Sequence, residues 1–129
     1  MSGLKLDVRA LHDPAGKQFS HHPGTHPEIL KGVVRHVDFK LVLSQFKGLF
    51  DDASLNMSIA IFCRAGKHRS VGVALAVEYI LKAEGCHVDL TFKGTWTVGR
   101  ECLVGKCQDC TYAARKGSLD HAMRVWQSL

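Results

Sequence analysis

The middle of the chain carries the residue types needed to bind a phosphate. They follow an apolar stretch and precede a stretch of helical periodicity, and they are Cys63, Arg64, Ala65, Gly66, Lys67, His68, Arg69 and Ser70. At such a strand-to-helix junction, backbone N–H groups and the positive pole of the helix converge on one anion. Gly66 allows tight curvature, and Arg69 can hold two phosphate oxygens with its planar guanidinium. The segment therefore predicts an anion-binding loop, and an ordinary basic connection is the alternative.

The thiol of Cys63 supports a second interpretation of the same segment. A cysteine beside a helix N-terminus and several cations has a lowered pKa and carries thiolate at neutral pH. A thiolate beneath a phosphate is a nucleophile for phosphoryl transfer. The spacing Cys-x2-Gly-x2-Arg-Ser from Cys63 to Ser70 is also that of cysteine-dependent phosphatases, although Phe62 replaces the histidine that commonly precedes the phosphatase cysteine.

A phosphatase also needs an acid that protonates the leaving group. Asp13, which follows the first predicted strand, could approach Cys63 if the strands before these two residues are neighbours. Asp7 lies nearer the strand interior and suits the orientation of Arg9. Because neither carboxylate stands out as the acid, we favour non-catalytic binding, with catalysis by Cys63 and Arg69 as the alternative.

Three of the five cysteines cluster towards the C-terminus. Cys102, Cys107 and Cys110 could supply three zinc ligands, although only the last two have the spacing of a zinc knuckle. The candidates for a fourth ligand are His121, Cys86 and His87. Free thiols in a loop are the favoured interpretation, since an odd cysteine count without a secretory signal does not indicate a disulfide framework. No cofactor is therefore expected, and a structural zinc is the alternative.

Three histidines precede the first predicted helix, at His21, His22 and His26. We interpret them as solvated loop residues. The alternative is that their loop leans over the anion-binding segment and places imidazoles near the ligand.

Alternating and apolar stretches indicate the elements that position these residues. Strands are expected at 3–9, 57–63 and 87–92, the second of them apolar enough to be fully buried in a parallel sheet. Helices are expected at 26–35, 38–50 and 69–83, followed by a closing helix that Ser118 caps. Thr25 and Glu28 form a capping box around Pro27, and Gly85 ends the third helix.

This order predicts a small three-layer α/β domain with a mostly parallel sheet and two right-handed crossovers. Ligands in such folds bind beyond the carboxyl ends of the strands, where residues 63–70 must lie. The 129 residues correspond to one domain, with a core at about 3–93 and a Cys- and Gly-rich segment with the closing helix at 94–129.

The composition bounds the class of protein and its partners. Hydrophobic residues make up 46% and charged residues 22%, which is typical of a folded globular protein. The formal net charge of +5 favours anionic partners such as phosphometabolites, nucleotides or RNA. No stretch has the length of a membrane span or the core of a signal peptide, so a cytoplasmic location is expected. The oligomeric state is left open.

Two passages, at residues 6–14 and 59–71, resemble the C-terminal domain of the RNase adapter protein RapZ. They read Leu-Asp-Val-Arg-Ala-Leu-His-Asp-Pro and Ile-Ala-Ile-Phe-Cys-Arg-Ala-Gly-Lys-His-Arg-Ser-Val. The family pattern has Asp-Val-Arg before an x-Pro turn, and Cys-x-Gly-Gly-x-His-Arg-Ser-Val after a buried strand. The likeness covers about residues 4–93, and its Cys-to-Val run is specific.

The resemblance implies an α/β fold whose pocket binds a phosphorylated aminosugar, in a protein that also binds regulatory RNA and presents it to a ribonuclease. The pocket residues that carry over by position are Cys63, Gly66, His68, Arg69 and Ser70, with Asp7 and Arg9 beside them. His12, in the turn after the first strand, is a further ligand-binding candidate. Ala65 replaces the first family glycine. No Gly-x4-Gly-Lys-Ser/Thr occurs, so ATP or GTP hydrolysis is not expected, and the cysteine segment stands where the family has a basic tract.

The sequence as a whole therefore predicts non-covalent binding or sensing of a phosphorylated small molecule, a sugar phosphate or a nucleotide, in the Cys63–Ser70 loop. The first alternative is a cysteine-dependent phosphatase that uses Cys63 and Arg69, with Asp13 as its acid. The second is an RNA-binding adapter that acts through the basic surface.

Overall fold

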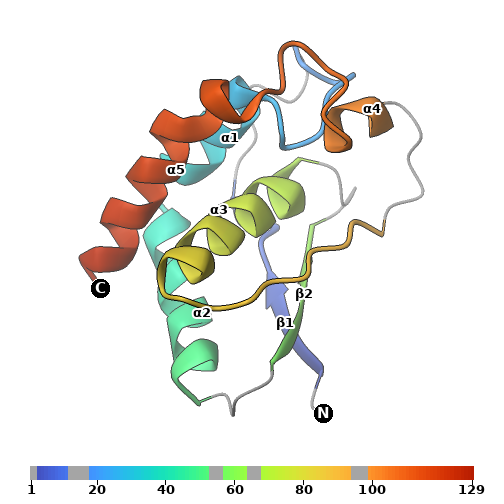
Figure 1. Cartoon of the computed structure of the whole chain (residues 1–129). Coiled ribbons are helices and arrows are strands. Elements are labelled where there is room, and N and C mark those ends of the chain that lie inside the picture. The colour runs from blue at the N-terminus through green and yellow to red at the C-terminus, as the bar shows by residue number, and fades with distance from the viewer. Residues whose placement is uncertain (1–2, 12–17, 53–56, 64–67, 94–98) are drawn as a thin grey trace.

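The computed structural model describes residues 3–11, 18–52, 57–63, 68–93 and 99–129 (Figure 1). In chain order the elements are β1 (Gly3–Asp7), α1 (Pro27–Val34), α2 (Phe39–Asp52), β2 (Ser58–Phe62), α3 (Arg69–Ala83), α4 (Arg100–Leu103) and α5 (Tyr112–Gln127). This arrangement confirms the predicted small α/β domain. Within the described ranges, no helix has the length and apolar character to cross a membrane.

The sheet consists of β1 and β2, which pair in parallel as predicted. The register runs from Gly3 opposite Ser58 to Asp7 opposite Phe62, and the N–H of Val8 continues it by donating to the Phe62 carbonyl at 3.0 Å. Two parallel strands require a crossover connection, which α1 and α2 provide. The carboxyl ends of both strands therefore lie side by side at one edge.

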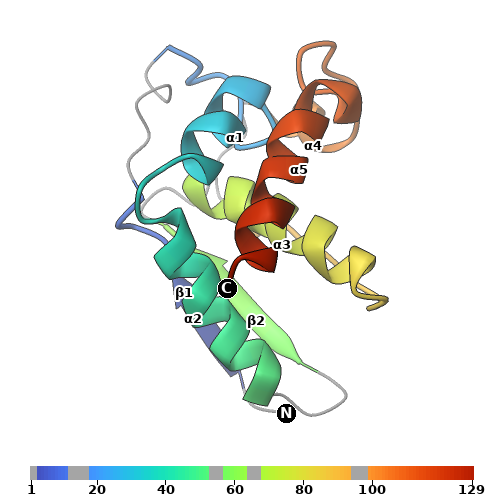
Figure 2. The same cartoon turned by 90° about the vertical axis from the view of Figure 1, so that its left-hand side faces the viewer.

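The prediction that β2 is fully buried is wrong. Its side chains alternate between exposed and half-buried, and Phe62 is 37% exposed. The neighbouring strand shows the same alternation, since Leu6 is buried whereas Lys5 and Asp7 are exposed. The helices that contact the strands, α2 and α3, lie on one side of the sheet (Figure 2), so the apolar side chains Ala60 and Phe62 on the other face of β2 stay in contact with solvent.

The third strand predicted at residues 87–92 is also absent: the structure describes this segment without a strand. The alternation itself is real, because Val88, Leu90 and Phe92 are half-buried between the exposed His87 and Asp89. Alternation reports which side chains face the core, but not whether the backbone pairs with a neighbour. After α3 the segment runs past the strands towards α4 (Figure 1). The described part of the chain therefore has one crossover between parallel strands, whereas two were predicted.

The first helix begins where predicted but with a different cap. Pro27 is its first residue, and the Nδ1 atom of His26 accepts a hydrogen bond from the Glu28 amide at 3.1 Å. Thr25, the predicted cap, precedes His26 in the chain and is buried. His26 has the extended backbone typical of a cap residue. Its imidazole nitrogen can replace the hydroxyl of a serine or threonine cap, because capping requires only an acceptor near the free amides of the first turn.

The predicted helix at 69–83 coincides with α3, and α2 agrees with its prediction within two residues. After α3, Gly85 adopts a left-handed backbone with φ of 89°. Its amide donates to Lys82, and that of Cys86 donates to Leu81, which together form a Schellman motif. Gly85 thus ends the helix as expected.

The closing helix α5 begins earlier than predicted. Thr111, not Ser118, is the cap, and its hydroxyl accepts the Ala114 amide at 3.2 Å. Gly117 lies inside this helix, where one glycine costs only about 1 kcal/mol, which packing readily offsets. The buried face of α5 consists of Leu119, Ala122 and Trp126.

The helices pack in two tiers on the sheet (Figures 1 and 2). The helix α2 contacts β1 and α3 contacts β2, whereas α1 and α5 pack on α3 and on each other. The described part of α5 also reaches α2, because Trp126 lies 6.0 Å from Phe46 and 6.1 Å from Phe50 between ring centroids. The C-terminal helix is therefore part of the core.

A polar contact between α3 and α5 provides a prediction of pH dependence. The hydroxyl of Tyr79 donates to Asp120 at 2.5 Å, and Lys116 pairs with the same carboxylate at 3.1 Å. These two hydrogen bonds, Tyr79 first, lower the pKa of Asp120 below its ordinary 3.8. Because the folded carboxyl binds protons less readily than the unfolded one, the contact stabilises the fold above pH 3.8 and is lost as the pH falls below it.

Asp120→Asn is therefore expected to lower Tm modestly at neutral pH, with the difference from wild type shrinking below the ordinary pKa of 3.8. Thermal unfolding at a series of pH values measures this. Asp89→Asn is the matched control, because Asp89 is exposed and pairs only with the exposed His87 among the described residues. A pH-independent difference for Asp120→Asn would contradict the assignment.

Candidate functional site

The predicted anion-binding segment is described at its two ends. Cys63 follows β2, and His68, Arg69 and Ser70 open α3. Outside the described residues lie Arg64, Ala65, Gly66 and Lys67, together with His12 and Asp13. The geometry of the site therefore rests on Cys63, the start of α3, and Asp7 with Arg9 at the end of β1.

Cys63 and Ser70 fix the two ends of the segment to each other. The backbone N–H of Ser70 donates to Cys63 Sγ at 3.3 Å, and the Cys63 thiol lies 3.4 Å from the Ser70 hydroxyl oxygen. Both side chains are buried. The thiol predicted at the helix N-terminus is therefore in contact with that terminus.

The start of α3 faces the carboxyl edge of the sheet. The first hydrogen bond of the helix runs from the Gly72 N–H to the His68 carbonyl at 2.9 Å. The amides of residues 69–71 therefore have no acceptor within the helix. His68 makes no side-chain cap, and its Nε2 lies 2.7 Å from the carbonyl of His22. The loop before α1 thus contacts the start of α3 through the backbone carbonyl of His22. That its imidazoles lie near a bound ligand stays a prediction.

Arg69 connects α3 to the chain after β1. One guanidinium nitrogen, Nη1, donates to the Arg9 carbonyl at 2.6 Å and to the Leu11 carbonyl at 3.1 Å. This bonding gives Arg69 a structural role, which sequence reasoning about a phosphate-binding fork did not include.

Asp7 and Arg9 pair directly, which agrees with the expectation that Asp7 orients Arg9. Arg9 donates to the carboxylate from its backbone N–H, from Nε and from Nη2, the last at 2.7 Å. Its guanidinium also lies 5.7 Å from the Phe62 ring centre. Hydrogen bonds from Arg9 lower the pKa of Asp7, so this carboxyl is ionised at neutral pH and cannot serve there as a general acid.

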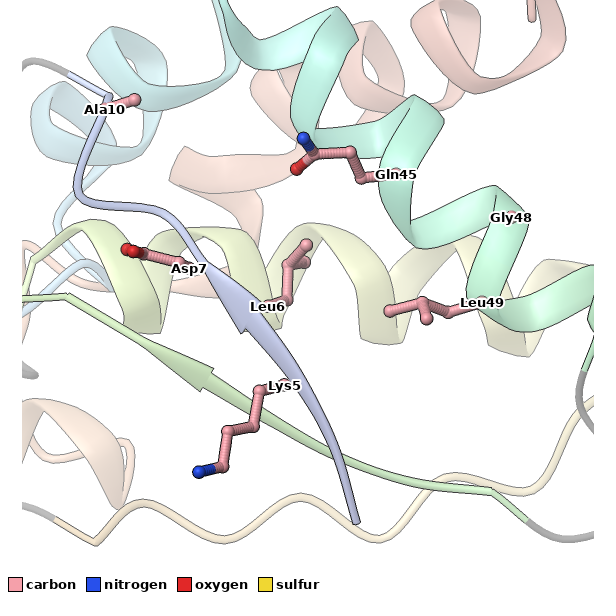
Figure 3. Close-up of a pocket in the computed structure, with 7 residues that line it drawn as sticks. All are labelled: Lys5, Leu6, Asp7, Ala10, Gln45, Gly48 and Leu49. Atoms are coloured by element: carbon pink, nitrogen blue, oxygen red, sulfur yellow. The ribbon is translucent and has the colours of Figure 1, made fainter. Parts of the chain in front are cut away.

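A pocket of about 650 Å³ opens beside Asp7, at the β1 side of the predicted site (Figure 3). It is lined by Lys5, Leu6, Asp7 and Ala10 along β1 and by Gln45, Gly48 and Leu49 on α2. Asp7 is the one predicted site residue among these lining residues. Sequence reasoning missed the pocket because its α2 side carries no residue with evident chemistry.

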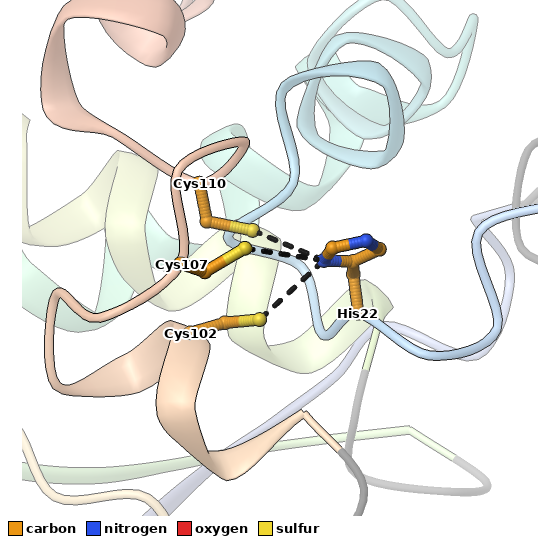
Figure 4. Close-up of side chains that lie close together, drawn as sticks. All are labelled: His22, Cys102, Cys107 and Cys110. Carbon is orange, nitrogen blue, oxygen red and sulfur yellow. Dashed lines mark hydrogen bonds between the residues drawn. The ribbon is translucent and has the colours of Figure 1, made fainter.

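A second cluster lies where the C-terminal segment meets the loop before α1 (Figure 4). The ligand atoms of His22, Cys102, Cys107 and Cys110 all lie within 4.8 Å of one another. The His22 Nδ1 atom is 3.4, 3.7 and 3.4 Å from the three sulfurs, in chain order. The described cluster is thus compatible with a bound metal ion.

The predicted fourth ligands were wrong, because none of His121, Cys86 and His87 belongs to the cluster. The fourth member is His22, which we had interpreted as a solvated loop residue. Between 80 and 88 residues separate it from the cysteines, so no local spacing could have indicated the pairing.

The thiols of the cluster differ in their pKa. Burial raises the pKa of Cys102 and of Cys110, and the neighbouring cysteines also raise that of Cys102. Burial would raise that of Cys107 as well, but hydrogen bonds from the backbone amides of Asp109 and Cys110 and from the other thiols lower it on balance. Cys107 is therefore the thiol of this cluster that deprotonates most readily.

Comparison with known proteins places the chain in a family. A model of the RapZ C-terminal domain matches residues 1–95. A protein of Anaeromyxobacter sp. (strain K) called "Nucleotide-binding protein" is 34% identical over 96 residues, which cover 67% of this chain and 33% of that protein. A nucleotide-binding protein of Desulfosudis oleivorans is 29% identical over 105 residues, 74% of this chain and 36% of its own length.

The chain spans about a third of the length of these curated relatives. No solved structure matches it. The family match includes the Cys63–Ser70 segment and His22, and it ends before the three clustered cysteines. The chain belongs to the RapZ C-terminal domain family.

Proposed function

We propose that this domain binds a phosphorylated small molecule, a sugar phosphate or a nucleotide, non-covalently at the start of α3. The observation that carries the proposal is the contact of the Ser70 amide and hydroxyl with Cys63 Sγ, at 3.3 and 3.4 Å. It fixes the first turn of α3 at the carboxyl edge of the parallel sheet, where the helix amides and the positive end of the helix dipole favour an anion. Arg64 and Lys67 add positive charge within the same segment.

Family membership supports the same class of ligand. The matched relatives carry the name nucleotide-binding protein, and the resemblance to RapZ implies a phosphorylated aminosugar. The name belongs to whole relatives about three times as long as the matched region. We therefore assign the shared chemistry, a phosphoryl group on a small molecule, and let the experiment choose between sugar phosphate and nucleotide.

Binding is preferred over phosphatase catalysis because of the described carboxylate. Asp7 is held ionised by Arg9, and the Cys63 thiol is buried against Ser70. A phosphatase needs a protonated acid beside the leaving group and an accessible thiolate. Asp13, the other acid considered, lies outside the described residues.

Calorimetric titration with inorganic phosphate, a hexosamine phosphate and ATP tests the proposal. Lys67→Ala is expected to weaken binding about tenfold or more, because a hydrogen bond to a charged group contributes about 1.5–3 kcal/mol. Lys40→Ala on the exposed face of α2 removes the same charge elsewhere and should leave the affinity unchanged. Arg69→Ala is a poorer probe, because it also removes the bonds to Arg9 and Leu11.

Equal affinity in the two lysine variants would contradict the proposed site. Hydrolysis of an aryl phosphate by the wild type, abolished in Cys63→Ser, would replace the binding assignment by the phosphatase one. Binding that survives in Cys63→Ser without any turnover is the expected result.

A further inference from the structure

Three sulfurs of the C-terminal segment converge on one imidazole nitrogen, and hydrogen bonding cannot account for this. Cys102, Cys107 and Cys110 approach His22 Nδ1 at 3.4, 3.7 and 3.4 Å. A neutral imidazole nitrogen offers one lone pair or one N–H, so it can satisfy one thiol. An ion at the centre of the four atoms would satisfy them all.

The separations agree with those of a tetrahedral zinc centre. With Zn–S of about 2.3 Å and Zn–N of about 2.05 Å, tetrahedral angles place each sulfur about 3.6 Å from the nitrogen and about 3.8 Å from the next sulfur. The three nitrogen–sulfur distances lie between 3.4 and 3.7 Å, and every pair lies within 4.8 Å. Three thiolates and one imidazole are also a ligand set of structural zinc sites, whereas calcium and magnesium prefer oxygen.

The surroundings of the cluster suit bound thiolates. Cys102 and Cys110 are 4% and 3% exposed, so water is largely excluded. Cys107, which lies between them in the chain, is half-buried. Two positive charges of zinc and three thiolates leave one net negative charge. The half-buried Arg115, whose Nη1 donates to the Cys110 carbonyl at 2.6 Å, lies close enough to balance it.

The cluster joins segments that are distant in sequence. The cysteines come from α4 and the turn before α5, and His22 comes from the loop before α1. Gly99, with φ of 89°, lies so close to the loop before α1 that a Cβ at this position would be 2.7 Å from the His21 carbonyl oxygen. The His22 carbonyl in turn bonds His68 at the start of α3. An ion at this point would hold the C-terminal segment and the α1 loop against α3.

We propose that His22, Cys102, Cys107 and Cys110 bind one structural zinc ion, which fastens residues 99–111 to the loop before α1. The site reaches beyond the family match, which covers residues 1–95. It replaces our initial preference for free thiols, and it does not depend on the ligand of the α3 site.

Metal analysis of protein purified without a polyhistidine tag should give about one zinc per chain. Chelation under reducing conditions is expected to lower Tm, and added zinc to restore it, because a site formed only in the folded chain couples binding to stability. Cobalt substitution should give the intense visible bands of tetrahedral cobalt with thiolate-to-cobalt charge transfer.

His22→Ala is expected to weaken zinc binding by more than about 100-fold, beyond the loss typical of outer-shell partners, and to change the cobalt spectrum. His22→Cys should recover binding. His21→Ala, at the exposed neighbouring histidine, and Cys86→Ser, outside the cluster, are matched controls that should keep wild-type affinity. If His22→Ala does not fold, zinc competition and the cobalt spectrum of the wild type decide.

Three results would overturn the proposal. The first is metal-free protein whose Tm responds to neither zinc nor chelator. The second is unchanged zinc affinity in His22→Ala. The third is a native mass two hydrogens below the reduced one with three titratable thiols instead of five, which would assign a disulfide within the cluster.

Discussion

Gly24→Ala is expected to destabilise the domain by about 3 kcal/mol or more, at the upper end of the cost of overpacking. A Cβ at this position would lie 2.3 Å from the His68 carbonyl oxygen and 2.4 Å from the Gly72 amide nitrogen. Both atoms belong to the backbone at the start of α3, so no side chain can rotate to make room. The loop before α1 would have to move away from the helix.

The same substitution should weaken phosphate binding, because it displaces the first turn of α3. Urea unfolding and phosphate titration measure the two effects. Gly48→Ala and Gly117→Ala are the controls, since a Cβ there meets nothing within 4 Å and both positions are helical. They should stabilise the fold by about 0.5–1 kcal/mol. Gly24→Ala with wild-type stability would show that the loop and helix are not packed as described.

Phe46→Ala is expected to cost about 3–5 kcal/mol, the range for a fully buried phenylalanine. Phe46 has no exposed surface, and its ring centre lies 6.0 Å from Trp126 and 6.2 Å from Phe50. The substitution therefore opens a cavity where α2 meets α5. The free energy of unfolding in urea, measured at constant zinc content, gives the size of the effect.

Leu41→Ala is the control for Phe46→Ala on the same helix. Leu41 is 57% exposed, and leucine and alanine have similar helix propensities, so its replacement should cost less than about 1 kcal/mol. Similar losses in the two variants would contradict the packing of α5 on α2. Phe46→Leu should fall between them, since it leaves a smaller cavity.

Long periodic stretches of sequence predicted the helices well. The bounds of α3 agree with its apolar pattern and with Gly85, because helical periodicity and a left-handed glycine are local signals. Helix starts were less predictable. His26 and Thr111 cap α1 and α5 in place of the predicted Thr25 and Ser118, because several nearby acceptors compete and packing selects one.

The strands show the limit of local pattern most clearly. The sequence correctly predicted parallel pairing of β1 with β2, since the connection between them is long enough for a crossover. It predicted a third strand at 87–92 and full burial of β2, and both were wrong. Alternation and apolarity record the environment of side chains, whereas a ladder needs a partner backbone at hydrogen-bonding distance, which no local pattern specifies.

The sequence by itself determined where the proposed anion-binding segment lies in the fold, because Cys63 and Ser70 are seven residues apart between a strand and a helix with strong local signals. Only the tertiary structure decided that Arg69 binds the carbonyls of Arg9 and Leu11, and that His22 meets three cysteines 80 or more residues away. Contacts of that range depend on how α1, α3 and α5 pack together. Residue spacing encodes neighbours along the chain, and only packing brings distant ones within reach of a single ion.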